Sequence, residues 1–206
     1  YREVRLLELA PVHVPVWGTQ VLTPYVGKDY ASVTLRTKLD GLKEGETVEI
    51  ETAVRNAAGA VVATKTDRRQ PAYGQPFEQH LTVDRPELWS PETPALYTAE
   101  SRVRVGGVEV DRYTTRFGIR TIEVRADKGF FLNGELRPFK GVCLHHDLGP
   151  LGAAVNRAAI RRQLTMLRDM GCNAVRTSHN MPAEALVELC DEMGFMVMVE
   201  PFDEWE

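Results

Sequence analysis

The chain has 206 residues, of which 43% are hydrophobic and 26% charged, with a formal net charge of -4 at pH 7. No apolar run approaches the about 20 residues that a membrane helix needs, so we expect a soluble protein with no membrane partner. Lysine and arginine are scattered along the chain, which argues against nucleic acid as a partner. The length is short of the about 250 residues of a (β/α)₈ barrel and too great for one sandwich, so two folding units, one of them cut, fit best.

Residues 1–16 read as the end of a strand from a preceding domain, followed by a linker that runs over Pro11 and Pro15. The sequence starts without an initiator Met or a signal peptide. It is therefore compatible with the cytoplasm, the periplasm or secretion.

Residues 17–125 consist of short alternating segments separated by turn signals, with no helical period. This spacing predicts an antiparallel, immunoglobulin-like β-sandwich of about seven strands. The segments are 31–39, 47–54, 60–66, 77–83, 97–105 and 108–117.

Aromatic residues in this first part offer an alternative function, because exposed rings can stack on sugars in a carbohydrate-binding module. The candidates are Trp17, Tyr25, Tyr30, Tyr73 and Trp89. Isolated loop aromatics more often fill packing gaps, and we favour that interpretation.

Residues 126–206 switch to an α/β pattern. Asn133-Gly134 between apolar residues predicts a hairpin, which we expect to close the floor of a barrel. Buried parallel strands are predicted at 139–144, 173–177 and 195–199, the last covered on both faces. Helices are predicted at 156–170, capped by Asn156, and from Pro182 to Gly194. The pattern is that of the first part of a TIM barrel, with three strands and two helices.

Polar residues follow each of these strands, and the carboxyl ends of parallel strands meet at one rim of a barrel, where its chemistry takes place. Such a rim suits a polyhydroxylated ligand, with hydrogen-bonding groups for hydroxyls and a flat ring for the sugar's C–H face. The residues are His145, His146 and Asp147, then Arg176, Ser178, His179 and Asn180, then Glu200, Asp203 and Trp205.

A metal-dependent hydrolase that uses His145, His179 and Glu200 as ligands is a second enzyme hypothesis. Barrels of that kind place two histidines one residue apart on the first strand, whereas His145 and His146 are neighbours and must point in opposite directions. Arg176 would also repel a divalent ion. We therefore expect no metal site.

The cysteines, Cys143, Cys172 and Cys190, lie within apolar patterns and lack CxxC spacing. We expect small buried thiols and neither a zinc site nor a disulfide framework.

Five stretches resemble glycoside hydrolase family two, the β-galactosidase, β-glucuronidase and β-mannosidase group. They are LWSPETPALY (88–97), RFGIRTIEV (116–124), GFFLNGELRPFKGVCLHHD (129–147), NAVRTSHNMP (173–182) and FMVMVEPFDEW (195–205). The resemblance spans nearly the whole chain, and its NAVRTSH motif is the most specific part. The HHD and SHN motifs favour the β-galactosidase-type members.

The resemblance implies a jelly-roll domain before residue 1 and a retaining mechanism with two glutamates, about 5 to 5.5 Å apart, through a glycosyl-enzyme intermediate. In the family these glutamates follow strand four and lie on strand seven of the barrel, outside these 206 residues. Glu200, Glu204 and Glu206 follow strand three and are not the catalytic pair. We expect the segment alone to be inactive.

What carries over by position is a supporting shell. Arg176 resembles the arginine that holds the nucleophile ionised. His145 and His179 resemble histidines that contact sugar hydroxyls, and Asn180, Glu200, Asp203 and Trp205 complete the predicted pocket wall.

The family needs no cofactor, although some members hold a divalent or monovalent cation, and the full-length enzyme is a candidate homo-oligomer. A carbohydrate, namely a β-galactoside or related glycan, is the expected ligand. Asn180-Met181-Pro182 and Val199-Glu200-Pro201 depart from the family pattern beside the pocket and leave the sugar open. The alternatives are a β-glucuronidase, a β-mannosidase, or a non-catalytic carbohydrate-binding or scaffold protein.

Overall fold

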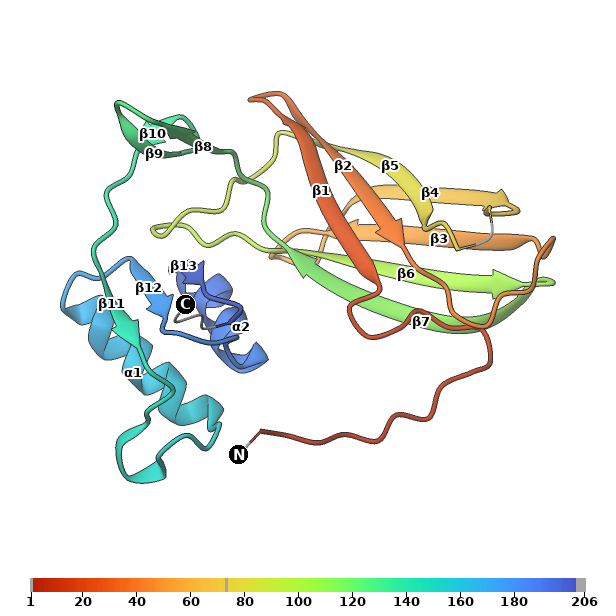
Figure 1. The fold of residues 1–206 in the computed structure, drawn as a ribbon. Helices are drawn as coiled ribbons and strands as arrows, with labels where there is room; N and C mark the ends of the chain where they lie inside the picture. The colour runs from red at the N-terminus through yellow and green to blue at the C-terminus, as the bar shows by residue number, and fades with distance from the viewer. Residues whose placement is uncertain (1, 73, 203–206) are drawn as a thin grey trace. The chain divides into compact units, whose positions relative to one another are not determined.

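The computed structural model describes residues 2–72 and 74–202 (Figure 1). The chain divides into two compact units, which we treat separately. One comprises Leu7–Leu88 and Ala95–Arg120, and the other comprises Tyr1–Leu6, Trp89–Pro94 and Thr121–Glu206. The division after residue 120 comes five residues before the boundary expected from the sequence, and the loop Trp89–Pro94 belongs to the second unit.

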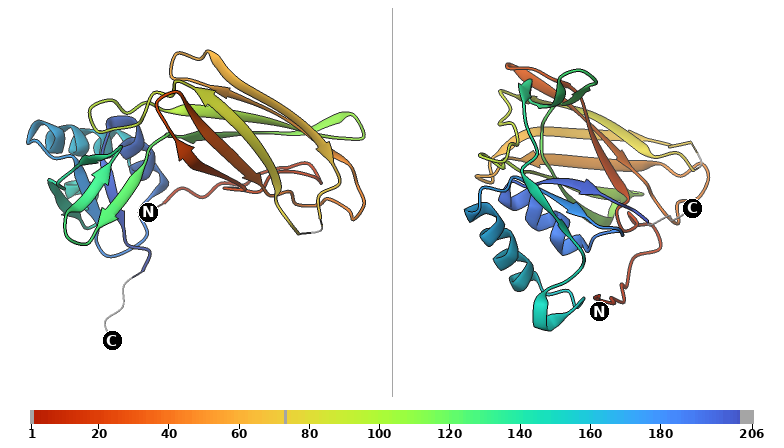
Figure 2. Two further views of the ribbon diagram at one scale, coloured as in Figure 1. Left: turned by 90° about the horizontal axis from the view of Figure 1, so that it is seen from above. Right: turned by 60° about the vertical axis from the view of Figure 1, so that its left-hand side comes forward.

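The first unit is the predicted sandwich, built from a three-stranded sheet in the order β1-β2-β5 and a four-stranded sheet in the order β4-β3-β6-β7, all antiparallel (Figure 2). Its strands are β1 (Thr19–Val26), β2 (Tyr30–Thr37), β3 (Val48–Arg55), β4 (Val61–Arg69), β5 (Phe77–Asp84), β6 (Tyr97–Val105) and β7 (Val108–Phe117). Strand β1 was missing from the predicted segments, because Pro24 and a register shift between Leu22 and Tyr25 interrupt its alternation.

Alternation places one face of each central strand in the core. In β3 the residues from Val48 to Val54 alternate between buried and half-buried, as the pattern predicts. The core also contains polar atoms: Thr52 Oγ1 lies 2.7 Å from Gln79 Oε1 and 2.8 Å from Ser101 Oγ. Gln79 Nε2 donates to the Ile50 carbonyl at 3.0 Å, so β5 is hydrogen-bonded to the facing sheet through a buried side chain.

The sandwich aromatics do not behave alike. Trp89 is buried and belongs to the second unit, where its Nε1 donates to the Asp191 carbonyl at 2.9 Å. Trp17, Tyr25 and Tyr30 are exposed. Tyr73 lies outside the described residues. The packing interpretation is therefore correct for Trp89, whereas Trp17 is exposed and Tyr25 and Tyr30, although exposed, pack against each other with ring centroids 4.8 Å apart.

The second unit holds the barrel segment, a parallel sheet in the order β11-β12-β13. Its elements are β11 (Gly141–Leu144), the short 3₁₀ helix η1 (Gly149–Leu151), α1 (Arg157–Asp169), β12 (Ala174–Thr177), α2 (Glu184–Met193) and β13 (Met196–Val199). As predicted, Asn156 caps α1 by accepting from the Ala159 amide at 3.0 Å. Both helices end at glycines with positive φ, Gly171 at 87° and Gly194 at 75°.

Both helices pack on one face of this sheet. Ile160 and Leu164 from α1 and Leu189 from α2 meet Val175 of β12 in one buried cluster. On the opposite face Ala174 and Met196 are buried, whereas Cys143 and Met198 are exposed, and in the described part of the chain β13 lies at an edge of the sheet. The expectation that 195–199 is covered on both faces therefore holds at Phe195 and Met196, which are buried, and is wrong at Met198 and Val199, which are about half exposed.

The Asn133-Gly134 hairpin is confirmed, with φ of 53° and 80°. Its strands, β9 (Gly129–Leu132) and β10 (Glu135–Leu136), form a separate antiparallel sheet with β8 (Ile122–Arg125) and do not pair with the parallel strands. The start of the chain differs from the expected strand: residues 2–12 are irregular, since no described strand pairs with them.

The cysteine prediction holds in part. Cys190 is buried in the helix-facing cluster, and burial raises the pKa of its thiol to about 12. Cys172 is half-buried, whereas Cys143 is exposed because it faces away from the helices.

Candidate active site

The register of the parallel sheet brings three side chains into one row. Cys143 of β11 pairs with Arg176 of β12, which pairs with Met198 of β13. Because side chains alternate along a strand and Val175 packs on the helices, this row lies on the face away from them. In a closed barrel that face is the interior.

The centre of the site is an ion-pair network around Glu200, directly after β13. Arg176 Nε donates to Glu200 Oε1 at 2.5 Å, and a second guanidinium nitrogen, NH2, reaches the same oxygen. The other carboxylate oxygen, Oε2, lies 2.9 Å from His179 Nδ1. The Glu200 amide donates to Thr177 Oγ1 at 3.0 Å, which fixes the backbone from which the carboxylate projects.

These contacts set the charge of the network. Partial burial alone would raise the pKa of Glu200, but the hydrogen bonds from Arg176 and His179 outweigh it and lower that pKa below its usual value. The hydrogen bond to Glu200 in turn raises the pKa of Arg176. Glu200 is thus a carboxylate and Arg176 a guanidinium at neutral pH.

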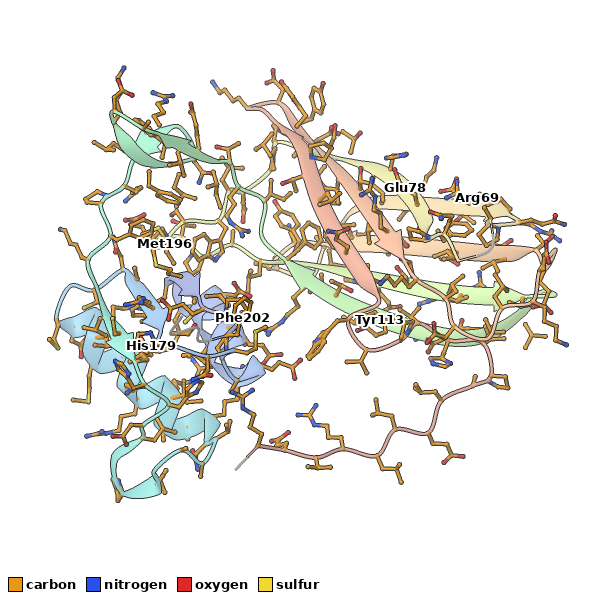
Figure 3. The ribbon with its side chains drawn as sticks, in the orientation of Figure 1. Arg69, Glu78, Tyr113, His179, Met196 and Phe202 are labelled. Atoms are coloured by element: carbon orange, nitrogen blue, oxygen red, sulfur yellow. The ribbon has the colours of Figure 1, made fainter. Side chains whose placement is uncertain are left out.

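His145 joins the network through a ring contact. The His145 and His179 rings are 5.5 Å apart at an interplanar angle of 80°, an edge-to-face arrangement. His179, labelled in Figure 3, therefore lies beside the end of β11 as well as beside Glu200. It follows a cis peptide bond between Ser178 and His179. The structure brings together four predicted residues, His145, Arg176, His179 and Glu200.

Other rim residues do not join them. His146, at a φ of 58°, lines a small hollow of about 50 Å³ beside α1, so it points away from His145 as its position in the sequence predicts. Asp147 Oδ1 accepts from the Gly149 amide at 2.7 Å and shapes the following loop. Asn180 is exposed on the turn after β12. Asp203 and Trp205 lie outside the described residues.

Two neighbours of the network were not among the predicted site residues. Cys143 Sγ lies 3.7 Å from Arg176 NH1, and the proximity of Ser178 and then Arg176 lowers the pKa of this thiol. Thr177 is buried and holds the Glu200 backbone. Strand parity could have identified Cys143, which lies two residues before His145 and on the same face of β11.

The arrangement can bind and orient a ligand, but Glu200 is not suited to act as a nucleophile or as a general acid. Glu200 is already neutralised by a guanidinium, so it is a poor nucleophile and a poor proton donor at neutral pH. Within residues 2–72 and 74–202, no group of three His, Cys, Asp or Glu is placed to hold a metal ion. The same residues contain no helix with the length and apolar character of a membrane span.

Comparison with known proteins accounts for nearly the whole chain. Residues 14–120 match the family described as glycosyl hydrolases family 2, and residues 122–204 match the family 2 TIM barrel domain. A β-galactosidase of Bacteroides ovatus is 46% identical over 208 residues, which cover 100% of this chain and 24% of that protein. A putative β-glucuronidase of Formosa agariphila is 38% identical, with coverage of 100% and 19%.

The fold has similar solved structures. A family 2 glycosyl hydrolase from Bacteroides cellulosilyticus superposes with a TM-score of 0.90 at 35% identity, covering 96% of this chain and 26% of that structure. A Bacteroides uniformis β-glucuronidase, solved covalently bound to cyclophellitol-6-carboxylate aziridine, has a TM-score of 0.81 at 29% identity, covering 93% and 24%. The chain spans about a quarter or less of the length of these relatives.

Proposed function

Because the chain belongs to the glycosyl hydrolases of family 2, we propose that the complete protein is a retaining β-glycosidase that releases terminal β-linked galactose. These 206 residues supply one wall of its sugar pocket. The observation that carries the proposal is the set formed by Arg176, Glu200 and His179 at the carboxyl ends of two parallel strands.

Arg176 can serve a second carboxylate as well as Glu200. A guanidinium has five N–H donors in a fixed fork, and Glu200 engages only the side formed by Nε and NH2. The NH1 side faces Cys143 on the interior row. We assign it to the nucleophilic glutamate supplied by a later strand, whose ionised form it would stabilise.

Two observations favour a neutral sugar such as galactose over a glucuronide. A glucuronide carries a carboxylate at C6 and needs a cation, whereas one side of the Arg176 guanidinium is paired with Glu200 and we assign the other side to the nucleophilic glutamate. The relative that is 46% identical is named a β-galactosidase. His145 and His179 are then the residues that contact sugar hydroxyls.

The test is a comparison of the full-length protein on four aryl glycosides: β-galactoside, β-glucuronide, β-mannoside and α-galactoside. We expect the β-galactoside to have the highest kcat/KM and the α-galactoside to remain intact. Faster turnover of the glucuronide or mannoside would replace the sugar assignment. Tight binding of galactose without turnover of any glycoside would show a carbohydrate-binding protein and refute the enzyme proposal.

A further inference from the structure

Both carboxylate oxygens of Glu200 contact neighbouring side chains. One oxygen accepts from Arg176 Nε at 2.5 Å, and the other faces His179 Nδ1 at 2.9 Å. The side chain is 22% exposed, and its backbone amide is tied to the buried Thr177. Glu200 is therefore placed to hold two other residues in position.

The contact with His179 determines where the proton of the neutral ring lies. Two lone pairs facing each other at 2.9 Å would repel, so Nδ1 must be the protonated nitrogen. The competing contact, from Arg176 NH2 to Nδ1, is 3.5 Å long and too weak to make Nδ1 an acceptor. The lone pair of the neutral ring then belongs to Nε2.

We propose that Glu200 is a positioning residue that fixes His179 in the Nδ1–H form, so that Nε2 accepts a hydrogen bond from a hydroxyl of the bound sugar. This inference rests on the proposed function, since it assigns a donor hydroxyl to the same pocket. The proposal gives the two residues different roles: Arg176 donates hydrogen bonds to carboxylates, and His179 accepts a hydrogen bond from a sugar hydroxyl.

The substitution Glu200→Gln tests this effect because it preserves the shape of the side chain and turns one of its two hydrogen-bond acceptors into a donor, while it also removes the negative charge. The amide oxygen would face Arg176, which can only donate, and the amide NH₂ would face His179. Nδ1 would become the acceptor, and the ring proton would move to Nε2. The variant would therefore present a donor to the sugar where the natural protein presents an acceptor.

The probes are aryl β-galactosides with fluorine in place of the hydroxyl at C3, C4 or C6. Fluorine accepts hydrogen bonds weakly and cannot donate them. Replacing the hydroxyl that donates to His179 should therefore lower kcat/KM of the natural full-length protein by about 10²-fold, which we call the fluorine penalty. In Glu200→Gln we expect this penalty to fall to less than about 10-fold. The inductive effect of fluorine is common to both proteins and cancels in the ratio. His179→Ala should retain only the part of the penalty that comes from the inductive effect.

Glu188→Gln is the matched control, because Glu188 forms an ion pair with Arg157 on the helices, away from the rim. It should keep the full fluorine penalty. Equal penalties in the natural protein and Glu200→Gln, or a penalty that is undiminished in His179→Ala, would overturn the inference while leaving the glycosidase intact. Absence of turnover in the natural protein would refute the proposed function first.

If Glu200→Gln does not fold, Glu200→Asp takes its place. A shorter carboxylate still accepts from both neighbours, so we expect kcat/KM to fall while the fluorine penalty persists. Loss of the penalty in Glu200→Asp would overturn the inference.

Discussion

Arg176 Nε and Glu200 Oε1 lie 2.5 Å apart, across two neighbouring parallel strands. Replacing the arginine would leave Glu200 without its cation and would remove the donor assigned to the nucleophile. We predict that Arg176→Ala lowers kcat/KM of the full-length protein by about 10²-fold or more. Steady-state kinetics with an aryl β-galactoside measures this.

The control for Arg176 is Arg161→Ala. Arg161 pairs with Glu192 at 2.7 Å between the two helices. The substitution Arg161→Ala therefore removes the same charge as Arg176→Ala, but far from the strand ends. Its kcat/KM should stay within about twofold of the natural value, because exposed ion pairs contribute little. Near-natural activity in Arg176→Ala would show that this rim is not the pocket wall.

The low pKa of Glu200 predicts how its contribution to stability varies with pH. Its pKa in the folded protein is below the ordinary value of 4.5, so folding favours the carboxylate. The stabilisation is present above pH 4.5 and is lost as the pH falls through the folded pKa. We expect the difference in melting temperature between the natural protein and Glu200→Gln to shrink as the pH falls below 4.5. A gap that widens with acid would contradict the assignment.

The buried amide of Gln79 makes a prediction for the sandwich. Gln79→Ala would leave the Thr52 hydroxyl with one partner fewer and open a cavity between the sheets. We predict a loss of about 2 kcal/mol in the free energy of unfolding. Gln75→Ala makes the same change at an exposed position and should cost less than about 0.5 kcal/mol. Chemical denaturation of the two variants measures the difference, and equal losses would disprove it.

Alanine substitutions at the two glycines that end the helices distinguish the effect of backbone strain on stability from the effect of a steric clash. An added Cβ at Gly194 would lie 2.3 Å from the Pro91 carbonyl oxygen, whereas one at Gly171 would meet nothing within 4 Å. Both have positive φ, so each alanine variant loses about 1 kcal/mol from the left-handed conformation. We predict that Gly194→Ala is clearly the less stable of the two in thermal unfolding. Equal melting temperatures would mean that Pro91 does not pack there.

The cysteines should react in a fixed order. Cys190 is buried with a pKa raised to about 12, whereas Cys143 is exposed with a lowered pKa. Because the thiolate is the nucleophile, iodoacetamide at pH 8 should modify Cys143 well before Cys190. Peptide mass mapping over time shows the order. Faster labelling of Cys190 would contradict the packing of α2 against the sheet.

Local patterns were sufficient to predict most of the fold. The alternation in β3, the Asn156 cap and the Asn133-Gly134 turn each depend on neighbours in the sequence, and each was found where predicted. The exposure of Cys143 and Met198 was not predicted, because apolar strand residues do not reveal which face of a sheet is covered.

The candidate site was predicted as a set of residues but not as a network. Strand ends placed Arg176, His179 and Glu200 at one rim, and the structure joins them. The contacts of Glu200 with Arg176 and His179 are known only from the distances in the structure. From the sequence alone, a glutamate after a strand is equally compatible with a residue that binds the sugar. Thr177 was missed because its role depends on the position of a backbone amide 23 residues away.

The loop Trp89–Pro94 lies between sandwich strands in the sequence, yet Trp89 bonds to the end of α2, Glu92 pairs with Arg137 at 2.6 Å, and Asn133 Nδ2 bonds to the Trp89 carbonyl at 3.0 Å. Six residues inserted within one domain's sequence thus complete the other domain's surface. A barrel excised at residue 121 for expression or grafting would expose the Gly194 backbone that Pro91 covers. A fragment that contains the barrel segment should therefore include this loop.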